Sequence, residues 1–134
     1  MESSDFKSVR EEIELALLSG IKSPDAFVAI DYDFIFLYIN HQAERLYGRK
    51  RRELLGRSIE SGFPELWNFG PFKNARQSVI ARKDVEIHYN APATNEWIQL
   101  IGRPFEKYYT FTYRLIDYKE VLRKELRRQV RKRE

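Results

Sequence analysis

The sequence of 134 residues contains no cysteine, two histidines and no long apolar run. Without cysteine there can be no disulfide, thiolate metal site, thiol nucleophile or thioether-linked haem. His41 and His88 lie far apart with no third ligand beside either, so no metal site is expected. No apolar stretch approaches the roughly 20 residues of a membrane span, and the polar, acidic start does not fit a signal peptide. We therefore expect a cytoplasmic domain with no membrane span in this segment.

The sequence also lacks the motifs of an enzyme. It has no Gly-rich phosphate loop and no serine in a nucleophile elbow. Its carboxylates are scattered, mostly over polar helix faces. We therefore predict no catalytic residues and no enzymatic activity.

The net charge of +4 is concentrated at the C-terminal end. Residues 118–134 carry eight Lys/Arg against three Glu, whereas the rest of the chain is nearly neutral. A basic helix can bind nucleic-acid phosphates or anionic lipid. Glu120 and Glu125 interrupt the charge, and no base-reading motif is present, so a solvated helix face is favoured and no nucleic-acid partner is predicted. Nucleic-acid binding by this helix is the alternative.

Hydrophobic periodicity predicts an α+β domain. An amphipathic helix is expected over residues 5–19. Two short helices should end at Gly48 and Gly56, the first capped by Asn40, with an apolar turn after the second and a longer helix over 71–82. Five antiparallel strands are predicted, over residues 26–31, 34–39, 85–90, 96–103 and 108–116. Because every residue of 34–39 is large and apolar, both faces of that strand should be covered.

Several landmarks resemble, in order and spacing, the PAS sensor domains of bacterial or archaeal signalling proteins. They are Phe27-Val28-Ala29-Ile30-Asp31, Tyr38-Ile39-Asn40, Leu46-Tyr47-Gly48, Glu53-Leu54-Leu55-Gly56-Arg57, the Trp97 strand ending at Pro104, and Asp117 before a helix. The resemblance implies a PAS fold over residues 23–117: a five-stranded antiparallel sheet with short helices packed on one face. An N-terminal amphipathic helix within 1–22 would precede it, and a connector helix over 118–134 would follow.

Strand phase and the resemblance together predict an apolar interior that could hold a ligand. The residues expected to face it are Val28, Ile30, Ile35, Leu37, Leu46, Leu55, Val79, Ile98, Leu100, Phe111, Tyr113 and Leu115. Tyr113 would supply a polar group. The phase of its strand points His88 outward, whereas in the other phase Glu86 and His88 would both enter the interior. The alternative for the whole set is a packed core without a ligand.

The resemblance also bears on cofactors. Light-sensing flavin members need a cysteine near the second helix, and this chain has none. Haem-binding members usually take the iron ligand from the long helix or the segment before it, here residues 60–83, which contain no histidine. No cofactor is therefore predicted, and a small apolar or amphipathic molecule is the candidate ligand. Non-covalent flavin is the alternative, although Ile98, Leu100 and Gly102 offer no amide side chain to bond its ring.

By the same resemblance, the chain should sense a molecule or partner and relay the change through its C-terminal helix. Asn40 and Asp117 are the predicted relay positions, with Asp117 as the pivot between strand and helix. Apolar residues at steps of four along residues 118–130 fit a partner helix, and an output domain of the same polypeptide is expected beyond them. A homodimer should form through the N-terminal helix and the outer sheet face. The alternative is a constitutive, ligand-free PAS dimerisation module.

Overall fold

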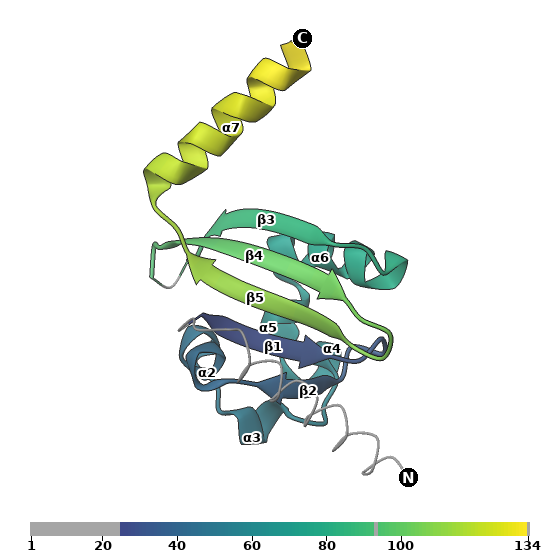
Figure 1. The fold of residues 1–134 in the computed structure, drawn as a ribbon. Coiled ribbons are helices and arrows are strands. Elements are labelled where there is room, and N and C mark those ends of the chain that lie inside the picture. Colours follow the sequence, from purple (N-terminus) through teal and green to yellow (C-terminus); the bar gives the residue numbers. More distant parts are fainter. Residues whose placement is uncertain (1–24, 93, 134) are drawn as a thin grey trace, which may run out of the picture.

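The computed structural model describes residues 25–92 and 94–133. Strands β1 (Ala26–Ile30), β2 (Phe36–Ile39), β3 (Val85–Asn90), β4 (Trp97–Pro104) and β5 (Tyr109–Leu115) form one antiparallel sheet in the order β2-β1-β5-β4-β3 (Figure 1). Helices α2 (His41–Tyr47), α3 (Arg51–Leu54), α4 (Ile59–Gly62), α5 (Pro64–Trp67) and α6 (Gly70–Ala81) lie between β2 and β3 in sequence, and α7 (Tyr118–Arg133) follows β5. The predicted five-stranded antiparallel fold is confirmed, whereas the helix expected over 5–19 lies outside the described residues.

The short helices begin and end where the sequence provides caps. The side chain of Asn40 accepts a hydrogen bond from the Ala43 amide at the start of α2. Gly48 follows α2 with φ 67°, and Gly56 follows the last turn of α3 with φ 80°. Only glycine adopts such left-handed angles without a steric cost, so both predicted helix ends are confirmed.

Two helices were not predicted from the sequence. The segment after Gly56, expected to be an apolar turn, contains α4 and α5, each four residues long. The Ser58 hydroxyl accepts from the Ser61 amide to start α4, and Pro64 starts α5. Helices of one turn show no hydrophobic period and are unstable alone, so packing against the sheet must hold them.

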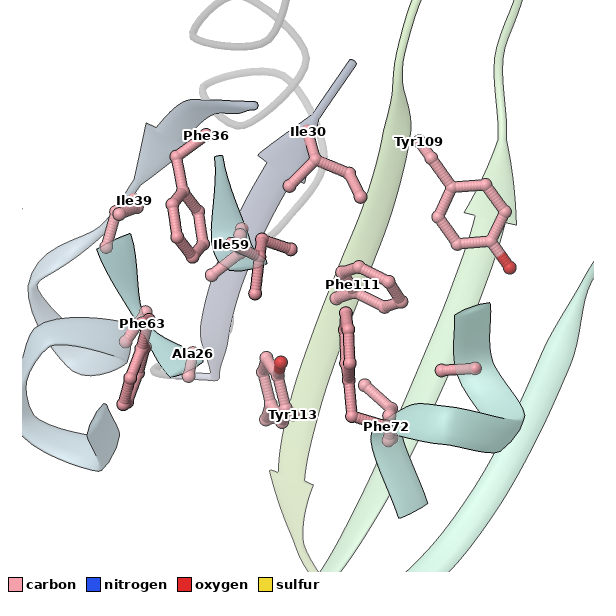
Figure 2. Packing of buried hydrophobic residues seen from close by; sticks show 14 of the residues in the cluster. Ala26, Ile30, Phe36, Ile39, Ile59, Phe63, Phe72, Tyr109, Phe111 and Tyr113 are labelled. Carbon is pink, nitrogen blue, oxygen red and sulfur yellow. The ribbon is translucent and has the colours of Figure 1, made fainter. Parts of the chain in front are cut away.

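The core lies between the inner face of the sheet and these helices (Figure 2). The central strands β1 and β5 contribute Val28, Ile30 and Phe111, each at most 1% exposed. From the helical side, Phe72 and Val79 of α6 pack into the same cluster. The short helices therefore cover one face of the sheet, as expected.

The prediction that Leu37 faces the interior is wrong, because β2 contains a β-bulge. Ala29 pairs with Tyr38 and Ile30 with Phe36, which leaves Leu37 as the extra residue. The bulge reverses the phase of the strand, so Phe36 joins the inner core and Leu37 packs on the outer face. There it belongs to a second group, here called the outer cluster, which consists of Phe27, Ala29, Leu37 and Tyr108 with Tyr38 packed against them. Both faces of this strand are therefore covered, as its composition predicted.

Ile35 and Leu115 also differ from the prediction. Ile35 precedes β2, where it makes an isolated bridge with Ser58, and it is not among the core residues. The cause is a turn in which the Asp31 carboxylate accepts from the Ile35 amide and Phe34 takes φ 64°, so the strand begins later than expected. Leu115 has the predicted phase, but it ends β5, lies beyond the last residue of β5 that pairs with β1 (Tyr113), and is 62% exposed.

Gly102 provides a test of how tightly β4 packs. A Cβ atom at this position would lie 2.5 Å from the Tyr109 hydroxyl and 2.7 Å from Val85 Cγ1. Gly102→Ala should therefore lower the free energy of unfolding by about 1–3 kcal/mol through overpacking, measured by urea denaturation.

The matched control is Gly70→Ala, where an added Cβ would meet nothing within 4 Å at the start of α6. Its free energy of unfolding should fall less than that of Gly102→Ala, because only the following Pro71 restricts a residue with a Cβ at this position. An equal loss in both variants would contradict the close packing around Gly102.

Candidate functional site

The inner core brings together most of the residues predicted to line the interior. Seven of them are buried there: Val28, Ile30, Val79, Ile98, Leu100, Phe111 and Tyr113. Leu46 and Leu55 are partly buried and pack against this cluster. The predicted interior therefore exists as one contiguous apolar region, without Ile35, Leu37 and Leu115.

Aromatic rings form a large part of this interior, and the sequence reasoning missed most of them. Tyr47 packs edge-on against Phe63 with ring centroids 5.2 Å apart, and Phe69 packs in the same way against Tyr89 at 5.3 Å. Figure 2 shows Phe63, Tyr113 and Phe111 among the residues that fill the space between helices and sheet. Phe63 and Phe69 flank the unpredicted helix α5, so strand phase gave no signal for them.

Two tyrosine hydroxyls meet inside the apolar interior. The hydroxyl oxygens of Tyr47 and Tyr113 are 2.6 Å apart, and their rings meet edge-on. Burial raises the pKa of both phenols above the usual value, so both stay protonated at neutral pH. One hydrogen bond between them uses one of their two protons, so the other can be donated to an acceptor. Tyr113 was predicted as a polar group, whereas Tyr47 was singled out only as the end of a helix.

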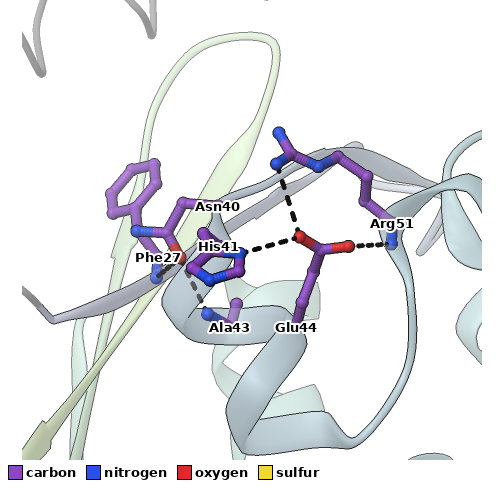
Figure 3. A network of polar contacts seen from close by, with 6 residues as sticks. All are labelled: Phe27, Asn40, His41, Ala43, Glu44 and Arg51. Atoms are coloured by element: carbon purple, nitrogen blue, oxygen red, sulfur yellow. Dashed lines mark hydrogen bonds and ion pairs between the residues drawn. The ribbon is translucent and has the colours of Figure 1, made fainter.

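Asn40 joins the first strand to the first described helix (Figure 3). Its side-chain oxygen accepts from the backbone amides of Phe27 at 3.0 Å and Ala43 at 2.9 Å. Its side-chain amide donates to the Asp25 carbonyl at 3.0 Å. One side chain thereby fixes the position of α2 relative to β1.

Glu44 of α2 holds the start of α3 through Arg51 (Figure 3). Its carboxylate accepts from the Arg51 amide at 2.8 Å and lies 3.3 Å from the Arg51 guanidinium. The backbone hydrogen bond from Arg51, more than its charge, lowers the pKa of Glu44. His41, 3.5 Å from the same carboxylate, is a surface residue.

Asp117 forms the junction between β5 and α7. Its carboxylate accepts from the Lys119 amide at 2.9 Å, and its carbonyl accepts from Glu120 at 2.9 Å. This is the pattern of a helix N-cap. Beside it, the ring of Tyr118 lies 5.7 Å from that of Trp97 in β4. The start of α7 is thus tied to the sheet by a cap and an aromatic contact.

Along its length, α7 presents an apolar stripe to solvent. Tyr118, Leu122, Leu126 and Val130, one per turn, are between 44% and 61% exposed. Val121 beside them is buried. Figure 1 shows α7 extending away from the sheet.

His88 lies on the outer face of the sheet, as its strand phase predicted. It pairs with Gln99 of β4, and its Nε2 atom lies 3.6 Å from the Glu86 carboxylate, which in turn lies 3.9 Å from the Lys124 ammonium. Within the described residues, no group of three or more His, Cys, Asp or Glu is placed to hold a metal ion. None of the described helices is long and apolar enough to cross a membrane.

Comparison with solved structures finds the same fold in signalling proteins. The PAS domain of Bordetella pertussis BvgS superposes with a TM-score of 0.62 at 13% identity, over 89% of this chain and 97% of that one. The photoactive yellow protein domain of the sensor histidine kinase Ppr from Rhodospirillum centenum gives 0.56 at 17%, over 69% and 86%. The PAS domain of the Cronobacter turicensis quorum-sensing receptor RpfR, solved in complex with C12:0, gives 0.54 at 13%, over 72% and 97%. At these identities the likeness concerns the fold.

Comparison with curated proteins finds no match. A scan against protein families matches the PAS domain over residues 24–116, which is more than half of the chain. That match, together with the sheet order and the short helices between β2 and β3, gives the family: the chain belongs to the PAS domains.

Proposed function

We propose that this PAS domain is a sensory module, which binds a small apolar or amphipathic molecule in its aromatic interior and passes the change through β5 to α7. The observation that carries the proposal is the position of Tyr113. Its hydroxyl meets Tyr47 inside the core, and four residues later the same strand leads to Asp117 and α7. A molecule that moves Tyr113 therefore acts on the strand that enters the helix.

The chemistry of the interior favours an apolar ligand with one oxygen acceptor. The surrounding side chains are aliphatic or aromatic, and the Tyr47 and Tyr113 hydroxyls meet inside it, whereas the Tyr109 hydroxyl donates to the Lys83 carbonyl. Ligand sites are typically apolar with a few convergent polar groups. RpfR, whose PAS domain has the same fold, was solved with C12:0, and this molecule is a suitable first probe. We propose no resident metal or cofactor and no catalytic role.

A ligand can shift the relay only by its different affinity for two states of the protein. We propose that these states differ in how α7 pairs with its copy in a homodimer, because the apolar stripe on α7 is exposed along four turns. The outer cluster and the N-terminal segment would complete the dimer, and an output domain would follow α7.

The second candidate is a constitutive dimerisation module whose interior is filled by its own side chains. The close edge-on contacts of Tyr47 with Phe63 and Tyr113 favour it, because a well-packed interior leaves less room for a ligand.

The two candidates predict different results in native mass spectrometry and thermal unfolding. A sensory module should retain a small molecule on purification, or its Tm should rise with the concentration of added C12:0, because binding to the folded state stabilises it. Acetate, which has the acid group without the apolar chain, is the control and should leave Tm unchanged. The mass of the bare chain, with no shift from C12:0 or small aromatics, would support the constitutive module.

The tyrosine pair should show strong energetic coupling. Tyr47→Phe and Tyr113→Phe should each lower the free energy of unfolding by about 1–2 kcal/mol, because each leaves a buried hydroxyl without its partner. The double variant should lose less than the sum of the two, since it removes both hydroxyls together. Tyr118→Phe, at an exposed ring, is the control and should change stability by less than about 0.5 kcal/mol. Additive losses in urea denaturation would show that the pair is not coupled.

Asp117→Ala should uncouple α7 from the sheet and leave the rest of the fold intact. Loss of the cap costs about 1 kcal/mol, concentrated in the first turn of the helix. Hydrogen exchange at Lys119 and Glu120 should accelerate and α7 self-association should weaken, whereas Asp117→Asn, which keeps the accepting oxygen, should behave like the original protein. Unchanged exchange and association in Asp117→Ala would remove Asp117 from the relay.

A further inference from the structure

His88 is a buried titratable group that the proposed ligand site does not use. Its side chain is 8% exposed, and its Nε2 atom is buried without a hydrogen-bond partner among the described residues. It lies on the outer face of β3, directly opposite Gln99 of β4, which is 5% exposed. β3 is the edge strand of the sheet, and α7 leaves the sheet on this side (Figure 1). The ring is therefore buried at the place where the connector helix departs.

Glu86 links this ring to α7. One of its carboxylate oxygens accepts from the Gln99 side-chain amide at 2.9 Å. The other lies 3.6 Å from His88 Nε2 and 3.9 Å from the Lys124 ammonium. A single carboxylate thus contacts the histidine on one side and the second turn of α7 on the other. Val121, one turn earlier on α7, is buried as well.

The surroundings favour the neutral ring. Burial is the largest cause that lowers the pKa of His88, and the nearby positive charge of Lys124 is the next. Glu86 opposes them by raising the pKa, but the net shift is downward. The groups that face the ring from each element are Glu86 on β3, Gln99 on β4, Arg114 beside Gln99 on β5, and Lys124, Glu125 and Arg128 on α7.

We propose that neutral His88 holds the first turns of α7 against the edge of the sheet, and that protonation of its ring releases them. This inference rests on the proposed relay through α7, to which it adds proton concentration as a second input. A proton on the ring places a positive charge in a dry site beside Lys124 and attracts the Glu86 carboxylate, which would then lose its contact with α7. Undocking of the helix exposes the imidazolium to water and separates it from Lys124.

The direction of the pH dependence follows from the lowered pKa. In the docked state His88 binds its proton less readily than when α7 is undocked and the ring is exposed. Docking is therefore strongest above the ordinary histidine pKa of about 6.5, and it weakens as the pH falls from there through the lower pKa of the docked state. The equilibrium constant between docked and undocked α7 therefore differs between high and low pH. The difference is about tenfold if the pKa values of His88 in the two states are one unit apart.

NMR of the whole 134-residue chain tests the proposal, since the sequence contains two histidines, His41 and His88, whose ring signals can be assigned with the variants below. Ring proton shifts should give His88 a pKa below the ordinary histidine value of about 6.5. Hydrogen-exchange protection factors at Val121 and Lys124 should fall severalfold from pH 8 to pH 5 and follow the titration of His88. In His88→Gln the protection factors should stay constant over this range, whereas His41→Gln should retain the fall.

A second variant keeps the test informative if His88→Gln unfolds. Lys124→Gln removes the neighbouring cation, so the pKa of His88 should rise and the loss of protection should begin at higher pH. Two results would overturn the proposal: a His88 pKa at or above the ordinary histidine value of about 6.5, or protection factors in α7 that do not change while His88 titrates. Both measurements are made without a ligand, so their failure is distinguishable from the failure of C12:0 to bind.

Discussion

The burial of aromatic and aliphatic side chains between the sheet and its short helices is the interaction on which the rest of the structure depends. Helices α2 to α5 contain four to seven residues each, too few to be stable in water alone. Their order comes from caps such as Asn40 and from rings that enter the common core. The candidate site therefore lies within the core itself, and a change of its packing is also a change in the positions of the helices.

The sequence predicted the features that arise from local rules. Runs of apolar and aromatic residues between turn signals located all five strands, and glycines at positive φ located two helix ends. The prediction that Leu37 faces the interior failed because a one-residue bulge reverses the phase of the strand. The residues of this strand are apolar on both faces, so no pattern in the sequence reveals the change. The prediction for Leu115 failed for a different reason: its phase was correct, but burial also depends on where the neighbouring strand β1 ends.

The candidate site was harder to predict than the fold because its central contact is long-range. Tyr47 and Tyr113 are 66 positions apart, and only the closed fold brings their hydroxyls together. Phe63 enters the interior from a segment without periodicity. The outward phase of His88 was predictable, but its burial was not, since this depends on long-range neighbours such as Gln99 of β4 and Lys124 of α7. Strand phase identifies the face on which a side chain lies, and tertiary contacts decide what covers it.

The attachment of α7 explains how a sensory domain of this kind could respond to small inputs. The described contacts at its base are few: the Asp117 cap, the ring pair of Tyr118 and Trp97, buried Val121, and the exposed charge contact of Lys124 with Glu86. Partly exposed ion pairs contribute little, and one cap contributes about 1 kcal/mol. A docking equilibrium held by such terms lies close to balance. A difference of about 1.4 kcal/mol, which lies within the range of one hydrogen bond at Tyr113, then changes the populations about tenfold. In the proposed relay, the core would hold the ligand and the weak junction would pass the change to α7.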